Sequence, residues 1–274
     1  MASPPPTSTE TAPPPQGRVL TVAGSDPSAG AGLQMDLKMI AAMGGIGLCA
    51  VTAITVQDTE RVHRVEPLDP ELVTAQMLAT LEDIGADVIK LGMLANGGIV
   101  SAVADVLGRY PEIPVVADPV LAGTGGGQLL DGDGRRRFMQ ELLPRITLLT
   151  PNLPEAQQLT RRTVSCEAEM EQAAHILTKP GGAKAVLITG GHLPGERITD
   201  LLFDGDTFYR RTQKRIPSNK GFHGTGCALA SSIASALALG HPLSQAVALA
   251  QRKLQQALHN ALPLGRGQRI LSGR

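Results

Sequence analysis

The sequence predicts one α/β domain in which helices cover both faces of a mostly parallel sheet. Short apolar runs alternate with amphipathic segments along most of the 274 residues. Several runs, such as "GLCAVTAITVQ" at 47–57, are continuously apolar, which is typical of strands covered on both faces. Apolar residues make up 42% of the chain, enough for the core of one sizeable domain.

The elements follow from local patterns. "RVLTVAGS" at 18–25 predicts a first buried strand, and 32–44 predicts a helix with Leu33, Leu37 and Ile40 on one face. Further strands are expected at 47–57, 61–68, 87–94, 114–120, 146–152 and 184–191, with further helices at 97–109, 131–143, 153–160, 165–178, 225–239 and 243–259.

Two elements have specific boundary signals. Asp69 is expected to cap a helix over 70–85, with Pro70 at its first position. The "DGD" turn in 197–216 predicts a β-hairpin. We expect one domain over 18–262, preceded by a disordered, Pro-rich tail at 1–17 and followed by a C-terminal tail at 263–274.

Composition argues against several classes of partner. The formal net charge is +0 and aromatic residues make up 2%, which disfavours nucleic acid. No apolar run is long enough to predict a membrane helix. Cys49, Cys166 and Cys227 form no CxxC pair, which disfavours a disulfide framework or a zinc site and favours a reducing cytoplasm.

Six loop segments come directly after apolar strands: "GSDPSAGAG", "VQD", "GML", "ADPV", "TPNLPEA" and "TGGH". Ligands of open α/β sheets bind beyond the carboxyl ends of the strands. In the first segment, Gly24, Gly30 and Gly32 permit close approach of a ligand. It is neither a GxGxxG fingerprint nor a P-loop, and a simple tight turn remains open. Asp36 in the next helix, taken alone, fits a solvated or dipole-facing carboxylate better than a ligand-binding one.

Two residues in these segments suit a flat heterocycle. The amide of Gln57 both donates and accepts hydrogen bonds, which matches an amino group beside a ring nitrogen. Met93 could form a flexible apolar wall. Alone, each also fits an ordinary role, at a strand end and in the core respectively.

Asn152 and Glu155 stand three residues apart at a helix start. They fit a capping arrangement, or a carboxylate and an amide that hold hydrated Mg²⁺ beside nucleotide phosphates. Asp118 in "ADPV" could serve the same ion or simply begin an Asp-Pro turn.

In "GTGCALASS", the backbone N–H groups of Gly224, Thr225, Gly226 and Cys227 precede a helix of small residues. Free N–H groups and the helix dipole favour an anion there. The same field is expected to lower the pKa of the Cys227 thiol. A small cysteine packed beneath a turn is the alternative.

Seven segments occur in order along the chain: "TVAGSDPSAGAGLQMDLK", "TAITVQDT", "KLGML", "DPV", "TPNLPEA", "GGH" and "HGTGCALAS". Together they resemble the hydroxymethylpyrimidine/phosphomethylpyrimidine kinase family of the ribokinase-like superfamily, from about residue 18 to 260. The resemblance implies a three-layer α/β/α fold and ATP-dependent, Mg²⁺-assisted phosphoryl transfer. The acceptor would be 4-amino-5-hydroxymethyl-2-methylpyrimidine, its monophosphate, or both, and a homodimer is common in the superfamily.

The resemblance also implies residue roles. Gln57 would contact the pyrimidine, with Gly24, Asp36 and Met93 beside it. The anion hole and the residue facing the acceptor hydroxyl would be Gly224–Cys227. Asn152, Glu155 and Thr189 would lie at ATP, with Asp118 and Glu155 at Mg²⁺.

Two family lysines are replaced here, by Thr189 in "TGGH" and by Thr124 in "AGTGGG". Lys90, Lys220 or Arg197 could compensate, and 122–127 could be a mobile lid over ATP. The rival interpretations are a pyridoxine or pyridoxal kinase, a non-catalytic pyrimidine-sensing domain and a dinucleotide-dependent oxidoreductase.

Overall fold

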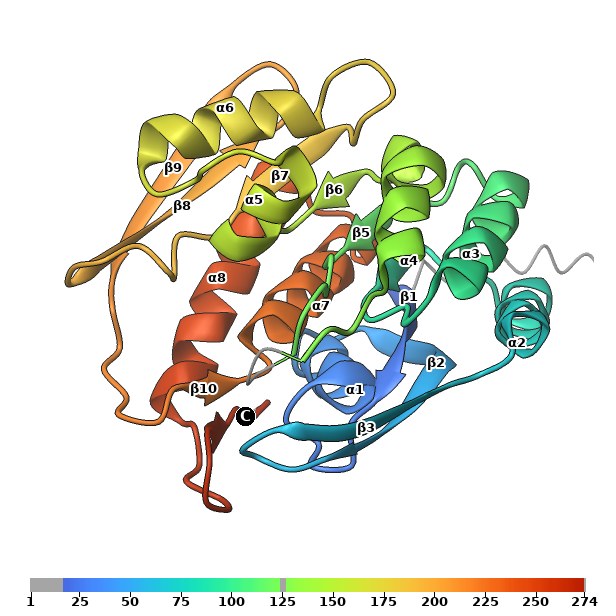
Figure 1. The fold of residues 1–274 in the computed structure, drawn as a ribbon, viewed down its shortest axis with the longest axis horizontal. Coiled ribbons are helices and arrows are strands. Elements are labelled where there is room, and N and C mark those ends of the chain that lie inside the picture. Colours follow the sequence, from blue (N-terminus) through green and yellow to red (C-terminus); the bar gives the residue numbers. More distant parts are fainter. Residues whose placement is uncertain (1–16, 124–126, 274) are drawn as a thin grey trace, which may run out of the picture.

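A computed structural model describes residues 17–123 and 127–273, and a nine-stranded sheet runs through its centre (Figure 1). Its order is β3-β2-β1-β4-β5-β6-β7-β8-β9. The strands are β1 (Arg18–Ser25), β2 (Ile46–Gln57), β3 (Val62–Pro67), β4 (Val88–Leu91), β5 (Val115–Ala117), β6 (Leu148–Leu149), β7 (Ala185–Ile188), β8 (Arg197–Phe203) and β9 (Phe208–Lys214). The central six strands are parallel, and β3, β8 and β9 add antiparallel edges. The predicted mostly parallel sheet is confirmed.

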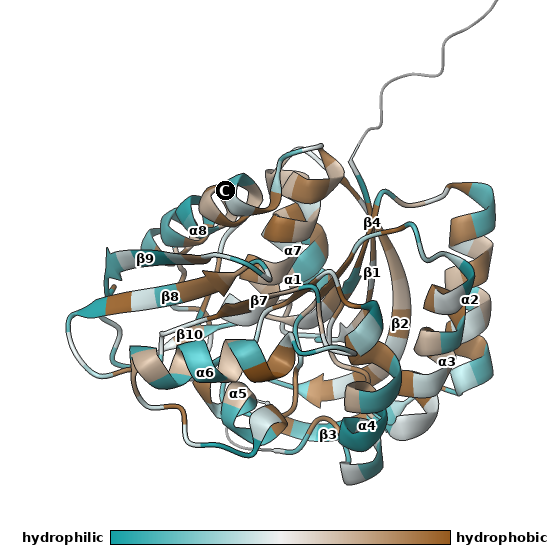
Figure 2. Ribbon diagram, turned by 90° about the horizontal axis from the view of Figure 1, so that it is seen from above, coloured by the Kyte–Doolittle hydropathy of each residue, from teal (hydrophilic) through white to brown (hydrophobic). Residues whose placement is uncertain are grey.

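Helices cover both faces of this sheet, as the two views show (Figures 1 and 2). One core joins the sheet to α1, α7 and α8, and another joins it to α2, α3, α5 and α6. Val19 and Leu20 of β1 contribute to opposite cores because successive strand side chains alternate. The α-helices are α1 (Gly32–Ala42), α2 (Pro70–Asp83), α3 (Gly97–Arg109), α4 (Gly132–Arg137), α5 (Leu153–Thr160), α6 (Glu167–Leu177), α7 (Thr225–Ala238) and α8 (Leu243–His259).

The expected signals at helix ends are present. Asp69 caps α2 by accepting a hydrogen bond from Glu71 N–H, with Pro70 in the first turn. The single helix predicted over 131–143 is instead α4 followed by a π-helical turn, η1 (Phe138–Leu142), and a 3₁₀ turn, η2 (Leu143–Arg145). Pro144 within η2 lacks the N–H that a continuing α-helix needs.

The prediction of a C-terminal tail over 263–274 is wrong. Within it, β11 (Arg269–Ile270) pairs in parallel with β10 (Phe222–His223), just before α7. Leu271 is buried against the core that contains α7 and α8. Short polar segments gave no sign of this pairing, because it joins residues almost 50 positions apart. The tail predicted at 1–17 lies outside the described residues except for Gly17.

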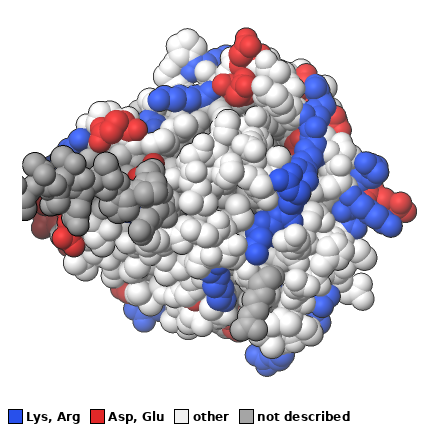
Figure 3. Space-filling model, turned by 180° about the vertical axis from the view of Figure 1, so that it is seen from behind, with Lys and Arg blue, Asp and Glu red and all other residues white. Residues whose placement is uncertain are grey.

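Charge is spread unevenly over the surface. On the face drawn in Figure 3, basic side chains form a narrow row and a few isolated spots around a broad uncharged area. Among the described helices, none is both long and apolar enough to cross a membrane.

Candidate functional site

Two neighbouring cavities lie beyond the carboxyl ends of the parallel strands. The larger, about 620 Å³, is bounded by the loops after β6 and β7, by the β8–β9 side and by α8. The smaller, about 430 Å³, is bounded by the loops after β1, β2, β4 and β5. Asp118, Glu155, His192, Thr225 and Gly226 line both. The six loops that the sequence singled out therefore meet around one two-part cleft at the start of α7.

Three of the four predicted substrate-binding residues line the smaller cavity. They are Gly24, Gln57 and Met93. A Cβ on Gly24 would lie 3.3 Å from the Met93 sulfur, so the glycine permits close packing of the cavity wall. Met93 thus packs against this loop and faces the cavity at the same time.

The prediction that Asp36 lines this cavity is wrong. Asp36 lies on the buried face of α1, where its carboxylate is 2.9 and 2.8 Å from Lys90 Nζ. Thr21 Oγ1 donates to the same carboxylate at 2.6 Å. Both charged side chains are fully buried, and each is matched by the other. Lys90 is therefore engaged in the core and does not replace a missing phosphate-binding lysine.

The start of α7 is shaped by Gly224, which has φ +74°. A Cβ there would lie 2.0 Å from Gly30 O, so only glycine fits the turn. No side chain within 17–123 or 127–273 caps this helix end, and Thr225 and Gly226 line both cavities. Helix N-termini of this kind attract anions, because their first N–H groups lack intrahelical acceptors.

Cys227 lines the smaller cavity beside this turn. Gly32 N–H donates to its sulfur, and its thiol is hydrogen-bonded to the Asp118 carboxyl group. Burial raises the pKa of the thiol to about 12, although the positive charge of Lys90 acts in the opposite direction. The predicted lowering of this pKa is wrong, because loss of hydration outweighs the nearby positive charge.

Asp118 and Glu155 form a pair of buried acids between the two cavities. Burial raises the pKa of Asp118 to about 6, with Lys90 opposing the shift. Burial and then the negative charge of Asp118 raise the pKa of Glu155 to about 8. Two carboxyl groups that repel each other in a buried site gain stability when a cation is shared between them.

Asn152 and Glu155 also form the capping box of α5. Asn152 Oδ1 accepts from Glu155 N–H at 3.0 Å, and Glu155 Oε2 accepts from Asn152 N–H at 2.9 Å. Both side chains line the cleft as well. The structural and the functional interpretations of this motif are therefore compatible, because the cap fixes the two oxygen-bearing groups at the cavity wall.

These oxygens suit Mg²⁺ held jointly with phosphate. Mg²⁺ commonly takes one or two protein carboxylates, with water and phosphate completing its octahedron. Among the described residues no group of three or more His, Cys, Asp and Glu side chains forms a metal site by itself. Asp118, Glu155 and Asn152 can thus contribute to such an ion together with a nucleotide.

The larger cavity contains Thr189 and a basic residue that the sequence did not single out, Arg215. Arg215 donates from Nη1 to Gly191 O at 2.7 Å and from Nε to Gly195 O at 2.9 Å. Lys220 Nζ instead donates to Arg266 O. Arg215 comes from the end of the β8–β9 hairpin, so no local motif could mark it. A mobile lid was predicted over 122–127. Its residues 124–126, which include Thr124, lie outside the described residues.

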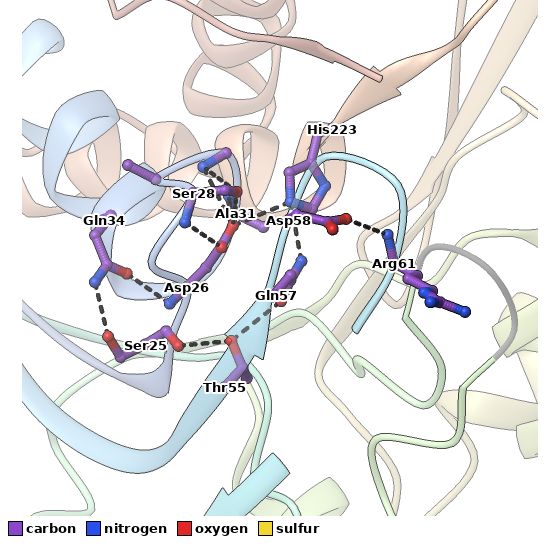
Figure 4. A network of polar contacts seen from close by, with 12 residues as sticks. Ser25, Asp26, Ser28, Ala31, Gln34, Thr55, Gln57, Asp58, Arg61 and His223 are labelled. Carbon is purple, nitrogen blue, oxygen red and sulfur yellow. Dashed lines mark hydrogen bonds and ion pairs between the residues drawn. The ribbon is translucent and has the colours of Figure 1, made fainter. Parts of the chain in front are cut away.

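A second group that sequence reasoning missed centres on His223 (Figure 4). His223 Nε2 lies 3.0 Å from Asp26 Oδ2 and 3.0 Å from Gln57 Nε2. Asp26, His223 and Gln57 all line the smaller cavity. Asp26 and His223 belong to the segments "GSDPSAGAG" and "HGTGC", but only the fold brings these segments together.

A family model described as phosphomethylpyrimidine kinase matches residues 26–272. The chain belongs to this family. A hydroxymethylpyrimidine/phosphomethylpyrimidine kinase from Rhizobium meliloti is 43% identical over 90% of this chain and 93% of its own. The thiamine biosynthesis bifunctional protein ThiED of Geobacter sulfurreducens is 44% identical over 93% of this chain, which spans about half (52%) of that relative.

Solved structures of family members and related kinases share the fold. A phosphomethylpyrimidine kinase from Clostridium difficile aligns with a TM-score of 0.77 and 35% identity, over 88% of this chain and 99% of that one. The ADP complex of Bacillus subtilis pyridoxal kinase aligns with a TM-score of 0.85 and 31% identity, over 93% of this chain and 96% of that one. A Staphylococcus aureus pyridoxal kinase in complex with AMP-PCP and pyridoxal aligns with a TM-score of 0.84 and 33% identity, over 93% of each chain. These kinases share the three-layer ribokinase-like architecture of this family member.

Proposed function

We propose that this chain transfers a phosphoryl group from ATP to 4-amino-5-hydroxymethyl-2-methylpyrimidine and to its monophosphate, in thiamine biosynthesis. One observation carries the proposal: Thr225 and Gly226, at the uncapped start of α7, line both cavities. A phosphoryl group held by these N–H groups has one cavity on each side, for donor and acceptor. Phosphoryl transfer depends mainly on such alignment and on neutralisation of charge.

The larger cavity is assigned to ATP. Its position between β7, β9 and α8 leaves room for a base and ribose, and Thr189 and Arg215 lie in its wall. Arg215 supplies a positive charge near the segment where the family lysine is replaced by Thr189. The structural neighbours solved with ADP and AMP-PCP support a nucleotide ligand for this fold.

The smaller cavity is assigned to the pyrimidine. Gln57 offers a donor and an acceptor, and Met93 offers an apolar wall against the ring. Gly24 leaves space for the ring beside the strand end. Cys227 at the α7 end then faces the hydroxymethyl group.

Cys227 and Asp118 are proposed to carry the proton of the acceptor hydroxyl. Because the thiol keeps its proton at neutral pH, it acts as a relay and not as a free thiolate. The sulfur accepts the hydroxyl proton late in the transfer while its own proton passes to Asp118, to which it is hydrogen-bonded. Asp118, with a pKa of about 6, is largely ionised at pH 7 and can receive it.

Glu155 and Asn152 would hold Mg²⁺ on the phosphate side, which leaves the Asp118 carboxylate free to accept the proton. Bound there, the ion would neutralise charge on the β and γ phosphate oxygens. Apart from the ion, the chain itself contributes the α7 N–H groups, Arg215 and the fixed capping box.

Pyridoxal is the second candidate substrate, because pyridoxal kinases are among the solved structures with the same fold. Gln57 and Met93 favour the pyrimidine. The test is ATP consumption with the hydroxymethylpyrimidine, its monophosphate and pyridoxal, each at matched concentrations. Turnover of pyridoxal alone would assign the chain to the second function, and turnover of none would support the sensing alternative.

We also propose a cytoplasmic homodimer that forms through the β2–β3 edge. Ile54 and Val56 on β2 are 47% and 55% exposed, which is unusual for large apolar side chains on one strand. β3 ends the sheet beside them and offers an unpaired edge. Cys49 and Cys166 are free and exposed, which suits a reducing compartment.

A further inference from the structure

One hydrogen-bonded chain runs from Asp26 through His223 and Gln57 to Thr55 (Figure 4). His223 is 4% exposed, and its ring lies against Gly30, where an added Cβ would be 2.1 Å from His223 Cδ2. The imidazole is thus held in one position by packing. The effect of these hydrogen bonds on the cavity depends on which of the linked atoms carry a hydrogen.

Asp26 can only accept. Its Oδ2 receives Ala31 N–H at 2.8 Å, Gly30 N–H at 3.2 Å and Ser28 Oγ at 2.9 Å, and its Oδ1 receives Ser28 N–H at 2.8 Å. Burial alone would raise the pKa of Asp26, but hydrogen bonds from His223 and Ser28 outweigh it and hold the pKa below its ordinary value. A carboxylate surrounded by donors leaves no place for a proton of its own.

His223 must therefore carry its hydrogen on Nε2. A bare Nε2 would turn its lone pair toward the Asp26 carboxylate at 3.0 Å. It would also leave a hydrogen on Nδ1, which is buried and without a hydrogen-bond partner among the described residues. Nε2–H removes both penalties and leaves only an unused acceptor at Nδ1.

The tautomer decides the orientation of the Gln57 amide. The structure has Gln57 Nε2 at 3.0 Å from His223 Nε2 and Gln57 Oε1 at 3.3 Å from Thr55 Oγ1, but a half-turn of the amide exchanges these two atoms without moving any other group. Because an N–H on His223 cannot face the NH₂ group, the tautomer requires the exchanged orientation, in which the amide oxygen shares the Nε2–H hydrogen with Asp26. In the exchanged orientation the NH₂ group takes the place of Oε1 and faces Thr55 Oγ1. This is consistent, because the single hydroxyl hydrogen of Thr55 is already donated to Ser25 O at 3.0 Å and its oxygen is free to accept.

We propose that His223 is a positioning residue that, anchored by Asp26, locks the Gln57 amide with its oxygen toward His223 and its NH₂ group toward Thr55. The smaller cavity then presents one fixed order of acceptor and donor. This inference rests on the proposed function of the cavity as the pyrimidine site. The fixed order of acceptor and donor selects a ring with an amino group beside an unprotonated nitrogen. It rejects the 4-oxo ring, whose carbonyl and N–H reverse the pattern.

The test compares two substrates and two matched variants. The substrates are 4-amino-5-hydroxymethyl-2-methylpyrimidine and 5-hydroxymethyl-2-methylpyrimidin-4-one. His223→Gln keeps an N–H donor near the Nε2 position, whereas His223→Met has a similar length and no donor. The readout is the ratio of kcat/KM for the two substrates, with KM for ATP measured alongside.

We expect the wild type and His223→Gln to prefer the amino substrate by about 100-fold, because the wrong edge leaves buried polar groups unpaired. His223→Met should lose about tenfold or more of this preference, with KM for ATP changed by less than about twofold. In a Gln57→Ala background, His223→Met should alter the preference no further. Full preference in the active His223→Met variant would overturn the proposal.

A second measurement needs no variant and no substrate. The ¹⁵N shifts of the His223 ring in the free wild-type protein report which nitrogen bears the hydrogen. Hydrogen on Nε2 supports the lock, and hydrogen on Nδ1 alone overturns it. Since this readout does not depend on turnover, it separates failure of the lock from failure of the proposed kinase activity.

Discussion

At the residue scale, burial has different effects on two pairs of ionisable side chains. Asp36 and Lys90 are both fully buried and form an ion pair, so each charge is compensated by the other. Asp118 and Glu155 are buried beside each other without such a match, and their pKa values rise. The first pair contributes to the core, whereas the second leaves a site that favours a cation.

Glu155 should make the ligand-free protein less stable as pH rises. Its pKa is raised to about 8, so the folded state binds more protons than the unfolded state between about pH 4.5 and 8. Stability therefore falls across this window. Glu155→Gln removes the effect and keeps the capping acceptor, so we expect a gain on the order of 4 kcal/mol at pH 8 and little change at pH 4.5.

Urea unfolding of both proteins at the two pH values measures this, without Mg²⁺ or nucleotide. Equal stability of the two proteins at pH 8 would contradict the assigned environment of Glu155. The same variant should turn over more slowly, because an acidic ligand for the ion is lost.

Cys227→Ala should lower kcat by on the order of 10²–10³ while KM for the pyrimidine changes little, since the thiol is proposed to act on the leaving proton. Wild-type kcat should also fall below about pH 6, where Asp118 becomes protonated. Steady-state kinetics from pH 5 to 8 measure both effects. A folded Cys227→Ala protein with wild-type turnover would refute the relay.

At the scale of elements, the start of α7 depends on the loop after β1. A Cβ on Gly224 would lie 2.0 Å from Gly30 O, and a Cβ on Gly30 would lie 2.1 Å from His223 Cδ2, so the turn before α7 and the "GSDPSAGAG" loop fit only with glycine at both positions. The capping box of α5 acts similarly, because a local helix signal also sets the position of two polar groups in the cleft.

Gly224→Ala should lose most activity, at least about 100-fold in kcat, because the new Cβ would push the α7 N–H groups away from Gly30 O. Gly240→Ala is the matched control. Gly240 also has positive φ (+87°), at the other end of α7, but an added Cβ there meets no atom within 4 Å. It should lose on the order of 1 kcal/mol of stability and keep its kcat. Equal kinetic loss in both variants would argue against a specific role of the turn.

At the scale of the whole molecule, both cavities lie beyond the carboxyl ends of the parallel strands. The β2–β3 ribbon forms one lateral side of the sheet. The exposed apolar side chains of β2 are separate from the cleft wall. Association of two copies there would bury them.

Val56→Lys should convert the proposed dimer to a monomer, because a charge would be buried at the interface. Ile84→Lys, at another apolar residue that is 46% exposed, is the control and should leave the dimer intact. Light scattering after size-exclusion chromatography measures the mass. A monomeric wild type, or a dimeric Val56→Lys protein, would contradict the proposed interface.

The sequence alone determined the order of the main strands and helices, the mostly parallel sheet and the family. It also marked the loops that line the cleft. These are local properties, since apolar period, capping residues and strand-end glycines act over a few neighbours. Gln57, Met93, Asn152 and Thr225 were found in this way.

Only the tertiary structure decided which polar groups are buried together. It removed Asp36 from the pocket by pairing it with Lys90, and it raised the pKa of Cys227 where its helix position alone predicted a lower one. It also added Arg215 and His223 and incorporated the C-terminal segment through β11. The physical reason is that hydration and charge pairing depend on neighbours in space, many of which are distant in the chain.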